Sequence, residues 1–119
     1  MADPITPEPK ARALSAEDNK LVVLARATRA RTRAAEGAAV RDTDGRTYAA
    51  ATVDLPSLQL SAVQVCIGMA VASGSAGLEA VVVLGDAEAL TEPDAAAISD
   101  FAGDDVVVHL ADPAGKLRA

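Results

Sequence analysis

The side chains best suited to metal binding or nucleophilic catalysis are scarce in this chain. The sequence holds a single cysteine, Cys66, and a single histidine, His109. A catalytic zinc ion needs three protein ligands, drawn from cysteine, histidine and carboxylate side chains, and an open position for water. With one thiol and one imidazole, the sequence argues against a three-ligand catalytic zinc centre, and we expect no bound cofactor.

Acidic side chains are also missing from the middle of the chain. Residues 55–78 contain no charged side chain, so no carboxylate for proton transfer can come from this segment. The segment is long enough to cross a bilayer. Its proline, two glutamines, four serines and three glycines favour instead a buried helix of a soluble protein, together with its loop.

The remaining candidates each have a structural interpretation. Cys66 has no basic neighbour in the sequence, which is typical of a buried and unreactive thiol. His109 ends an apolar strand, and no partner nucleophile or ligand set accompanies it. Glu92 and Asp94 flank Pro93 at a predicted helix start, where acids satisfy free backbone N–H groups. A weak metal site is the alternative interpretation of these two acids.

The first half of the chain predicts a helix, a hairpin and a second helix. Ser15 is suited to cap a helix that runs to about residue 35, with one face formed by Leu21, Leu24, Ala25 and Thr28. Asp-Thr-Asp-Gly at residues 42–45 predicts a turn between two antiparallel strands, the second being residues 46–53. A central helix is expected from residue 56 or 57 to about 73. Its apolar residues point in all directions, so most of its surface must be covered.

The second half of the chain predicts strands alternating with a helix. Residues 80–84, Ala-Val-Val-Val-Leu, are typical of a strand that is buried on both faces. A helix at about 93–101 and a strand at 106–110 follow, and residues 113–115 form a turn. The element order predicts an α/β fold, in which helices pack on a mixed sheet.

The composition predicts one domain that associates with copies of itself. We expect residues 15–119 to form the domain and residues 1–14, with three prolines among charged and small side chains, to form a flexible tail. Half of the residues are apolar, but only Tyr48 and Phe101 are aromatic. A core of small side chains buries little area per residue, and association often compensates for it. A homodimer or homotetramer is therefore expected.

The charge distribution limits the classes of partner. A net charge of −6 makes a nucleic-acid partner improbable, because nucleic-acid binders normally carry a basic stripe. Residues 1–53 hold nine basic and seven acidic side chains, whereas residues 54–119 hold two and ten. The densest positive cluster, Arg26, Arg29, Arg31 and Arg33, is either a solvated helix face or a contact for a partner or phosphate. The lone cysteine and the absence of a signal peptide favour a cytoplasmic protein without a membrane partner.

Several local motifs, taken in this order, resemble the small cytidine deaminase family. They are Gly-Ala-Ala-Val at residues 37–40, Asp-Gly at 44–45, Thr-Val-Asp-Leu at 52–55 and Ser-Asp-Phe-Ala-Gly-Asp-Asp at 99–105. The resemblance covers about residues 16–118. It implies a three-layer α/β/α sandwich with a mixed sheet, and family members commonly assemble as dimers or tetramers around the central helix.

The same resemblance implies that the catalytic site is degenerate. Family members hold zinc and a proton-shuttling glutamate at two helix starts. The family's Cys-Ala-Glu corresponds to residues 63–65, so that Val63 replaces a ligand and Val65 replaces the glutamate. The family's Cys-x-x-Cys corresponds to residues 91–94, where Thr91 and Asp94 keep the spacing without either thiol.

The resemblance leaves three functions open. Our first interpretation is a non-catalytic pseudoenzyme that acts through self-association and binding of a protein partner. The second is a nucleoside or nucleotide sensor, in which Thr52 and Asp54 occupy the family's ribose-binding positions with shorter side chains. The third is a residual cytidine deaminase, which the missing ligands and the missing glutamate disfavour.

Overall fold

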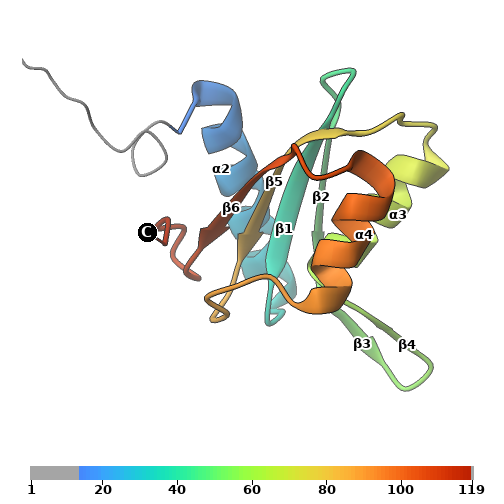
Figure 1. Cartoon of the computed structure of the whole chain (residues 1–119). Coiled ribbons are helices and arrows are strands. Elements are labelled where there is room, and N and C mark those ends of the chain that lie inside the picture. The colour runs from blue at the N-terminus through green and yellow to red at the C-terminus, as the bar shows by residue number, and fades with distance from the viewer. Residues whose placement is uncertain (1–13, 119) are drawn as a thin grey trace, which may run out of the picture.

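A computed structural model of the chain describes residues 14–118. The elements, labelled as in Figure 1, are helices α2 (Ala16–Thr32), α3 (Ala62–Ala72) and α4 (Glu92–Ala102), and strands β1 (Gly37–Asp42), β2 (Thr47–Ala51), β3 (Val53–Leu55), β4 (Leu58–Leu60), β5 (Leu78–Leu84) and β6 (Val107–Ala111). The expected tail at residues 1–14 lies outside the described residues except for Leu14. No helix among residues 14–118 is both long and apolar enough to cross a membrane.

The predicted mixed sheet is confirmed, and it forms the middle of three layers. Strands lie in the order β2-β1-β5-β6. The pairs β2/β1 and β1/β5 are antiparallel, whereas β5 and β6 are parallel. Helix α2 covers one face of this sheet, and helices α3 and α4 cover the other (Figure 1). This arrangement is the α/β/α sandwich expected from the sequence.

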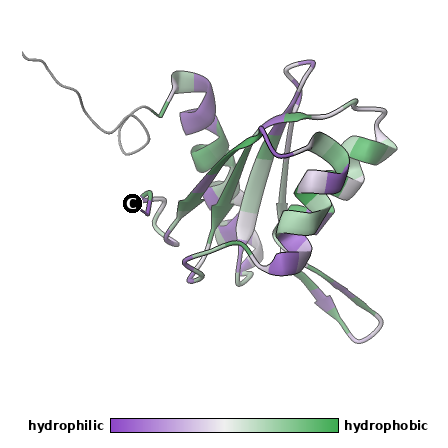
Figure 2. Cartoon of the chain, viewed as in Figure 1, coloured by the Kyte–Doolittle hydropathy of each residue, from purple (hydrophilic) through white to green (hydrophobic). Residues whose placement is uncertain are grey.

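The alternation of side chains along each strand explains why both faces are covered. Successive residues of a strand point to opposite faces. In β5, Val81 and Val83 join the core beneath α3 and α4, whereas Val82 and Leu84 join the core beneath α2. Strands β5 and β6 are accordingly hydrophobic over most of their length (Figure 2). A sheet with two apolar faces is stable only when helices exclude water from both.

Helix α2 begins and packs largely as predicted. Ser15 caps it, because its Oγ accepts a hydrogen bond of 3.0 Å from the Asp18 N–H. The helix ends at Thr32, three residues earlier than expected, since Arg33 adopts a left-handed conformation with φ of 56°. The buried face contains Val22 in place of Leu24, and Leu24 is 36% exposed.

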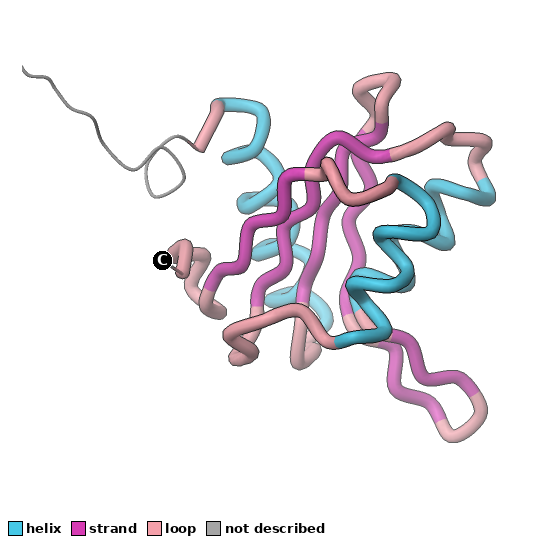
Figure 3. Tube along the Cα trace, viewed as in Figure 1, coloured by secondary structure: helices cyan, strands magenta, loops and turns pink. Residues whose placement is uncertain are grey.

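The start of the central helix was predicted wrongly. Residues 53–60 form a second hairpin, β3–β4, and helix α3 begins only at Ala62. Pro56 and Ser57 form the turn of this hairpin, which projects away from the main sheet (Figure 3). Val53 and Leu55 flank Asp54, and Leu58 and Leu60 flank Gln59. This period of two marks a strand on each side of the turn. Consequently the expected strand at residues 46–53 is divided between β2 and β3.

The outer edge of β6 is partly covered by the residues that follow it. The chain turns back at residues 112–116, where the Asp112 N–H donates to the Lys116 carbonyl at 2.8 Å. The Arg118 N–H then donates to the Leu110 carbonyl, also at 2.8 Å. This returning segment forms an isolated antiparallel bridge between Ala111 and Leu117.

Gly37 sets the distance between helix α2 and strand β1. A Cβ atom at this position would lie 2.3 Å from the Ala25 carbonyl oxygen and 2.8 Å from the Arg29 Cβ. Both contacts are closer than real Cβ atoms make. Any side chain at residue 37 would therefore push α2 away from the sheet.

We predict that Gly37→Ala lowers the free energy of unfolding by about 1–3 kcal/mol or more, since overpacking at a helix–sheet contact strains both elements. The matched control is Gly68→Ala. Nothing lies within 4 Å of a Cβ added at Gly68, and alanine favours a helix over glycine by about 0.5–1 kcal/mol. Denaturant unfolding of both variants, followed by circular dichroism, measures the two effects. Equal stabilities for the two variants would contradict this account of Gly37.

Candidate functional site

The starts of helices α3 and α4 meet beside the sheet and are joined by one hydrogen bond. Ser61 caps α3, and its Oγ accepts from the Gln64 N–H at 3.0 Å while the Gln64 side chain accepts from the Ser61 N–H at 2.9 Å. The Ser61 Oγ also donates to Asp94 Oδ1 at 2.5 Å. Asp94 lies in the first turn of α4 and is only 3% exposed. A short bond to a buried carboxylate therefore ties the two helix starts together.

Of the two acids predicted at this helix start, Asp94 departs from the expected capping role and Glu92 lies where an acid was expected. Thr91 is the cap of α4, since its hydroxyl accepts from the Asp94 N–H at 3.2 Å. The Asp94 carboxylate is turned toward Ser61 on the neighbouring helix, so it does not cap its own helix. Glu92 is exposed in the first turn, where a negative charge is favourable.

Glu36 brings a second carboxyl group to the same place. It directly precedes β1, and its side chain passes beside Gly85, where an added Cβ would lie 3.3 Å from the Glu36 Cγ. Burial raises the pKa of the Glu36 carboxyl, and the nearby negative charge of Asp94 raises it further. A hydrogen bond from the Ala62 backbone opposes this rise in pKa. The site is thus acidic and partly desolvated.

The two residues expected at the sugar-binding positions border an open cavity of about 360 Å³. Its lining consists of Glu36, Thr52, Val53, Asp54, Gln59, Leu60 and Ser61. The Thr52 hydroxyl accepts from the Glu36 N–H at 3.0 Å and donates to the Glu36 carbonyl at 3.4 Å. Asp54 is exposed on β3 and accepts from the Gln59 amide at 3.4 Å. Of the two side chains, Asp54 is the one more open to a ligand.

The residues at the expected zinc positions do not fit a zinc ion. Val63 is completely buried in the core, and Val65 packs against the same core. Neither side chain has an atom that can bind a metal. The Thr91 hydroxyl caps α4, which leaves the Asp94 carboxylate as the sole strong donor among the four positions. Within residues 14–118, no three histidine, cysteine, aspartate or glutamate side chains are grouped so that they could hold a metal.

Cys66 is placed in the core and is poorly suited to nucleophilic chemistry. It is fully buried in α3, and its Sγ lies 3.7 Å from the Tyr48 carbonyl oxygen, to which it donates. Burial raises the pKa of the Cys66 thiol to about 12. Because the thiolate is the reactive form, Cys66 is a small hydrophobic residue at neutral pH.

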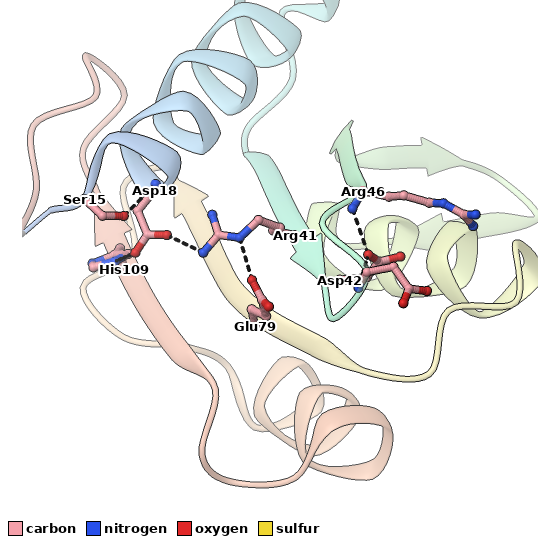
Figure 4. A network of polar contacts seen from close by, with 8 residues as sticks. Ser15, Asp18, Arg41, Asp42, Arg46, Glu79 and His109 are labelled. Atoms are coloured by element: carbon pink, nitrogen blue, oxygen red, sulfur yellow. Dashed lines mark hydrogen bonds and ion pairs between the residues drawn. The ribbon is translucent and has the colours of Figure 1, made fainter.

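His109 belongs to a different polar cluster, on the α2 side of the sheet (Figure 4). Its Nε2 lies 2.9 Å from Asp18 Oδ2, and the other carboxylate oxygen accepts from Arg41 at 2.8 Å. Arg41 also donates to Glu79 at 2.8 Å. Burial alone would raise the pKa of Asp18, but the hydrogen bonds from His109 and Arg41 outweigh it and lower that pKa. The cluster joins α2 to β1, β5 and β6, as the structural interpretation of His109 predicts.

Three residues of the site, Ser61, Gln64 and Glu36, were not identified from the sequence. Ser61 and Gln64 form the Ser-x-x-Gln pattern of a capping box before an apolar run, so this helix start carries a readable signal. No sequence pattern identifies Glu36, because its role depends on the approach of β1 to two helices that are distant in the sequence.

Comparison with known proteins matches both the sequence and the fold. A family model described as cytidine deaminase-like matches residues 14–115. The chain resembles the crystal structure of cytidine deaminase from Burkholderia pseudomallei with a TM-score of 0.74 and 22% identity, covering 83% of this chain and 87% of that one. The enzyme from Mycobacterium leprae gives 0.65 and 23%, with 84% and 90% covered. The enzyme from Mycobacterium tuberculosis gives 0.66 and 22%, with 84% and 87% covered. No curated protein sequence matches the chain.

We predict that Glu36→Gln raises the free energy of unfolding at pH 7. The folded-state pKa of Glu36 lies above its unfolded value of 4.5, so the native protein loses stability as the pH rises and this group becomes charged. The gain should stay below about 1 kcal/mol, because Glu36 is partly exposed and water screens its charge. Below pH 4.5 both states are protonated, and the gain should disappear.

The control for this substitution is Glu92→Gln, which removes an exposed charge from the first turn of α4. That charge favours the helix, so its loss should lower the stability at pH 7 by about 0.3–1 kcal/mol. Thermal unfolding of both variants between pH 4 and pH 8 gives the comparison. An effect of Glu36→Gln that persists unchanged at pH 4 would exclude this explanation.

Proposed function

Since this chain belongs to the cytidine deaminase-like family, we propose that it is a non-catalytic member, a pseudoenzyme that acts through self-association and binding of a protein partner. The observation that carries the proposal is the chemistry of residues 63, 65, 91 and 94. These positions hold two aliphatic side chains, a capping hydroxyl and a hydrogen-bonded carboxylate.

Deamination of a cytosine ring needs an activated water and a group that moves protons beside it. Val65 stands where the resemblance puts the proton shuttle, and an aliphatic side chain transfers no proton. A second carboxyl group close to Asp94 is that of Glu36, which belongs to the segment before β1. Two carboxylates without a bound cation repel one another, so a further negative group such as hydroxide is disfavoured at this place.

The uncharged middle of the chain supports self-association. Leu55 is 56% exposed and Leu58 is 48% exposed, and they are paired across the β3–β4 hairpin. Val71, near the end of α3, is 53% exposed. We infer that the hairpin and the outer side of α3 form the main contact between copies, because exposed apolar side chains without surrounding charges are typical of interfaces. The buried single thiol fits a cytoplasmic protein, in which disulfides are rare.

A nucleoside sensor is the second candidate, and the cavity beside Asp54 is the observation that favours it. Its volume of about 360 Å³ lies at the lower end of the range for small-molecule sites. The bonds between Thr52 and Glu36 weaken this candidate, because a sugar hydroxyl would have to compete with them. Calorimetric titration with cytidine, uridine and their phosphates should give no binding heat at millimolar ligand. Measurable heat that is lost in Asp54→Ala would favour the sensor.

For the pseudoenzyme, we predict that the purified protein retains no stoichiometric zinc after dialysis against excess zinc. We further predict that it leaves the ultraviolet absorbance of cytidine unchanged. The matched variant carries Val63→Cys, Thr91→Cys and Asp94→Cys, which supplies three thiols at the two helix starts. This variant should retain about one zinc per chain, measured by atomic absorption, if its circular dichroism shows that it is folded.

The two measurements distinguish a wrong functional proposal from a wrong assignment of the ligand positions. Stoichiometric zinc and conversion of cytidine to uridine by the unchanged chain would overturn the proposal and favour a residual deaminase. A folded triple-cysteine variant without zinc would instead show that residues 63, 91 and 94 are not the counterparts of the family's ligands.

A further inference from the structure

The outer face of helix α2 combines apolar and basic side chains. We use the name α2 outer face for Lys20, Val23, Leu24, Ala27, Ala30 and Arg31, which follow one another around one side of the helix and are all exposed. Val23 is 58% exposed and Leu24 is 36% exposed. The opposite side of the helix packs on the sheet, so this face has no partner within the described fold.

The outer face of helix α4 has complementary properties. We use the name α4 outer face for Glu92, Ala95, Ala96, Ser99 and Asp100, all of them exposed, together with Asp104 just beyond the helix. Its centre consists of small side chains, and its border is acidic. The Ser99 hydroxyl donates to Asp104 Oδ1 at 2.9 Å and so fixes one of these acids. Residues 86–105 contain seven acidic side chains and no lysine or arginine.

The charged side chains of both faces are free to pair with another molecule. Among residues 14–118, each ion pair involves Asp18 or Arg41, and none includes a charge of either face. The described fold therefore leaves a basic apolar helix on one side of the sheet and an acidic helix of small residues on the other.

We propose that the α2 outer face of one copy packs on the α4 outer face of a second copy. Val23 and Leu24 would fit against Ala95, Ala96 and Ser99, because small residues allow two helices to approach closely. Lys20 and Arg31 would then lie beside Glu92 and Asp100. Opposite charges at the rim of a contact speed its formation and select its partner.

This contact joins two surfaces that one copy cannot present to the same partner, so it does not close a two-fold dimer. The two faces lie in opposite outer layers of the fold (Figure 1). Each copy that uses its α2 outer face still presents a free α4 outer face, and the contact produces rings or open chains of molecules. It is independent of the apolar contact proposed for the hairpin and α3, and it adds a second direction of assembly.

The contact should be weak and sensitive to salt. Helix α4 has 11 residues, about 16 Å in length, so one pair of helices buries less area than a typical stable interface. Exposed charges at its rim are screened over about 10 Å at an ionic strength of about 0.1 M. Assembly through these faces should therefore increase with protein concentration and decrease with salt.

The test uses two charge-reversed variants of the full chain, Lys20→Glu with Arg31→Glu, and Glu92→Lys with Asp100→Lys. At about 50 mM salt, light scattering should show that the mass of the unchanged protein increases with concentration. Each variant alone should weaken this increase by about tenfold or more in association constant. An equimolar mixture of the two should restore it, since the reversed α2 outer face of one variant then meets the reversed α4 outer face of the other.

A control with the same change in net charge as Lys20→Glu with Arg31→Glu carries Arg46→Glu and Lys116→Glu. Both positions are exposed outside the two faces, so this control should assemble like the unchanged protein. Unaltered assembly of both test variants, or a mixture that fails to restore it, overturns this inference. Binding of anionic lipid vesicles is a further measurement. If Lys20→Glu with Arg31→Glu abolishes this binding but leaves the mass from light scattering unchanged, the basic face binds a membrane, and the proposed contact between copies is overturned. Leu55→Asp with Leu58→Asp tests the hairpin contact separately, since that contact should be insensitive to salt.

Discussion

The Ser61–Asp94 hydrogen bond determines the character of the candidate site. A buried carboxylate is costly unless donors satisfy it, and here the donor comes from the cap of the neighbouring helix. The bond positions α4 against α3 without a metal. At these two helix starts, where the family resemblance puts zinc, this chain holds a serine and a carboxylate that bind each other.

Apolar contacts hold the central helix of the fold, which is consistent with the proposed loss of catalysis. Val63 and Cys66 are fully buried in the core beneath α3, so the central helix is held by apolar contacts on its inner side. The remaining polar groups are committed to local bonds, as the Thr52 hydroxyl is to the Glu36 backbone. Only Glu36 departs from this pattern, since burial and the charge of Asp94 both raise its pKa. Glu36 is therefore a carboxyl group whose charged form is disfavoured in the folded protein.

The sequence predicted the elements whose signals are local. The Asp-Gly turn at residues 44–45 and the apolar run at residues 80–84 were both recognised, because turn chemistry and continuous burial are visible within a few residues. The β3–β4 hairpin was missed for a definite reason. Leu58 and Leu60 have the spacing of a strand, but they directly precede the apolar residues of α3, and the two patterns merge into one uncharged segment. Only Ser61, the capping residue, marks where the period changes from two to 3.6.

The place of Asp94 at a helix start could be inferred from the sequence, but its partner Ser61 could not. Spacing within a motif is a property of the chain, whereas the approach of Ser61 to Asp94 depends on how two helices pack on the same face of a sheet. The same holds for His109, whose partner Asp18 is 91 residues away in sequence. Contacts of this kind depend on the order of strands in the sheet, and that order cannot be predicted from any single segment of the sequence.

The returning segment after β6 protects part of one border of the sheet. A strand at the border of a sheet offers unpaired backbone groups that can recruit a strand from another molecule. The bond from Arg118 to Leu110 and the bridge between Ala111 and Leu117 occupy part of that border with the chain's own backbone. The returning segment thereby limits strand-by-strand growth at this border of the sheet.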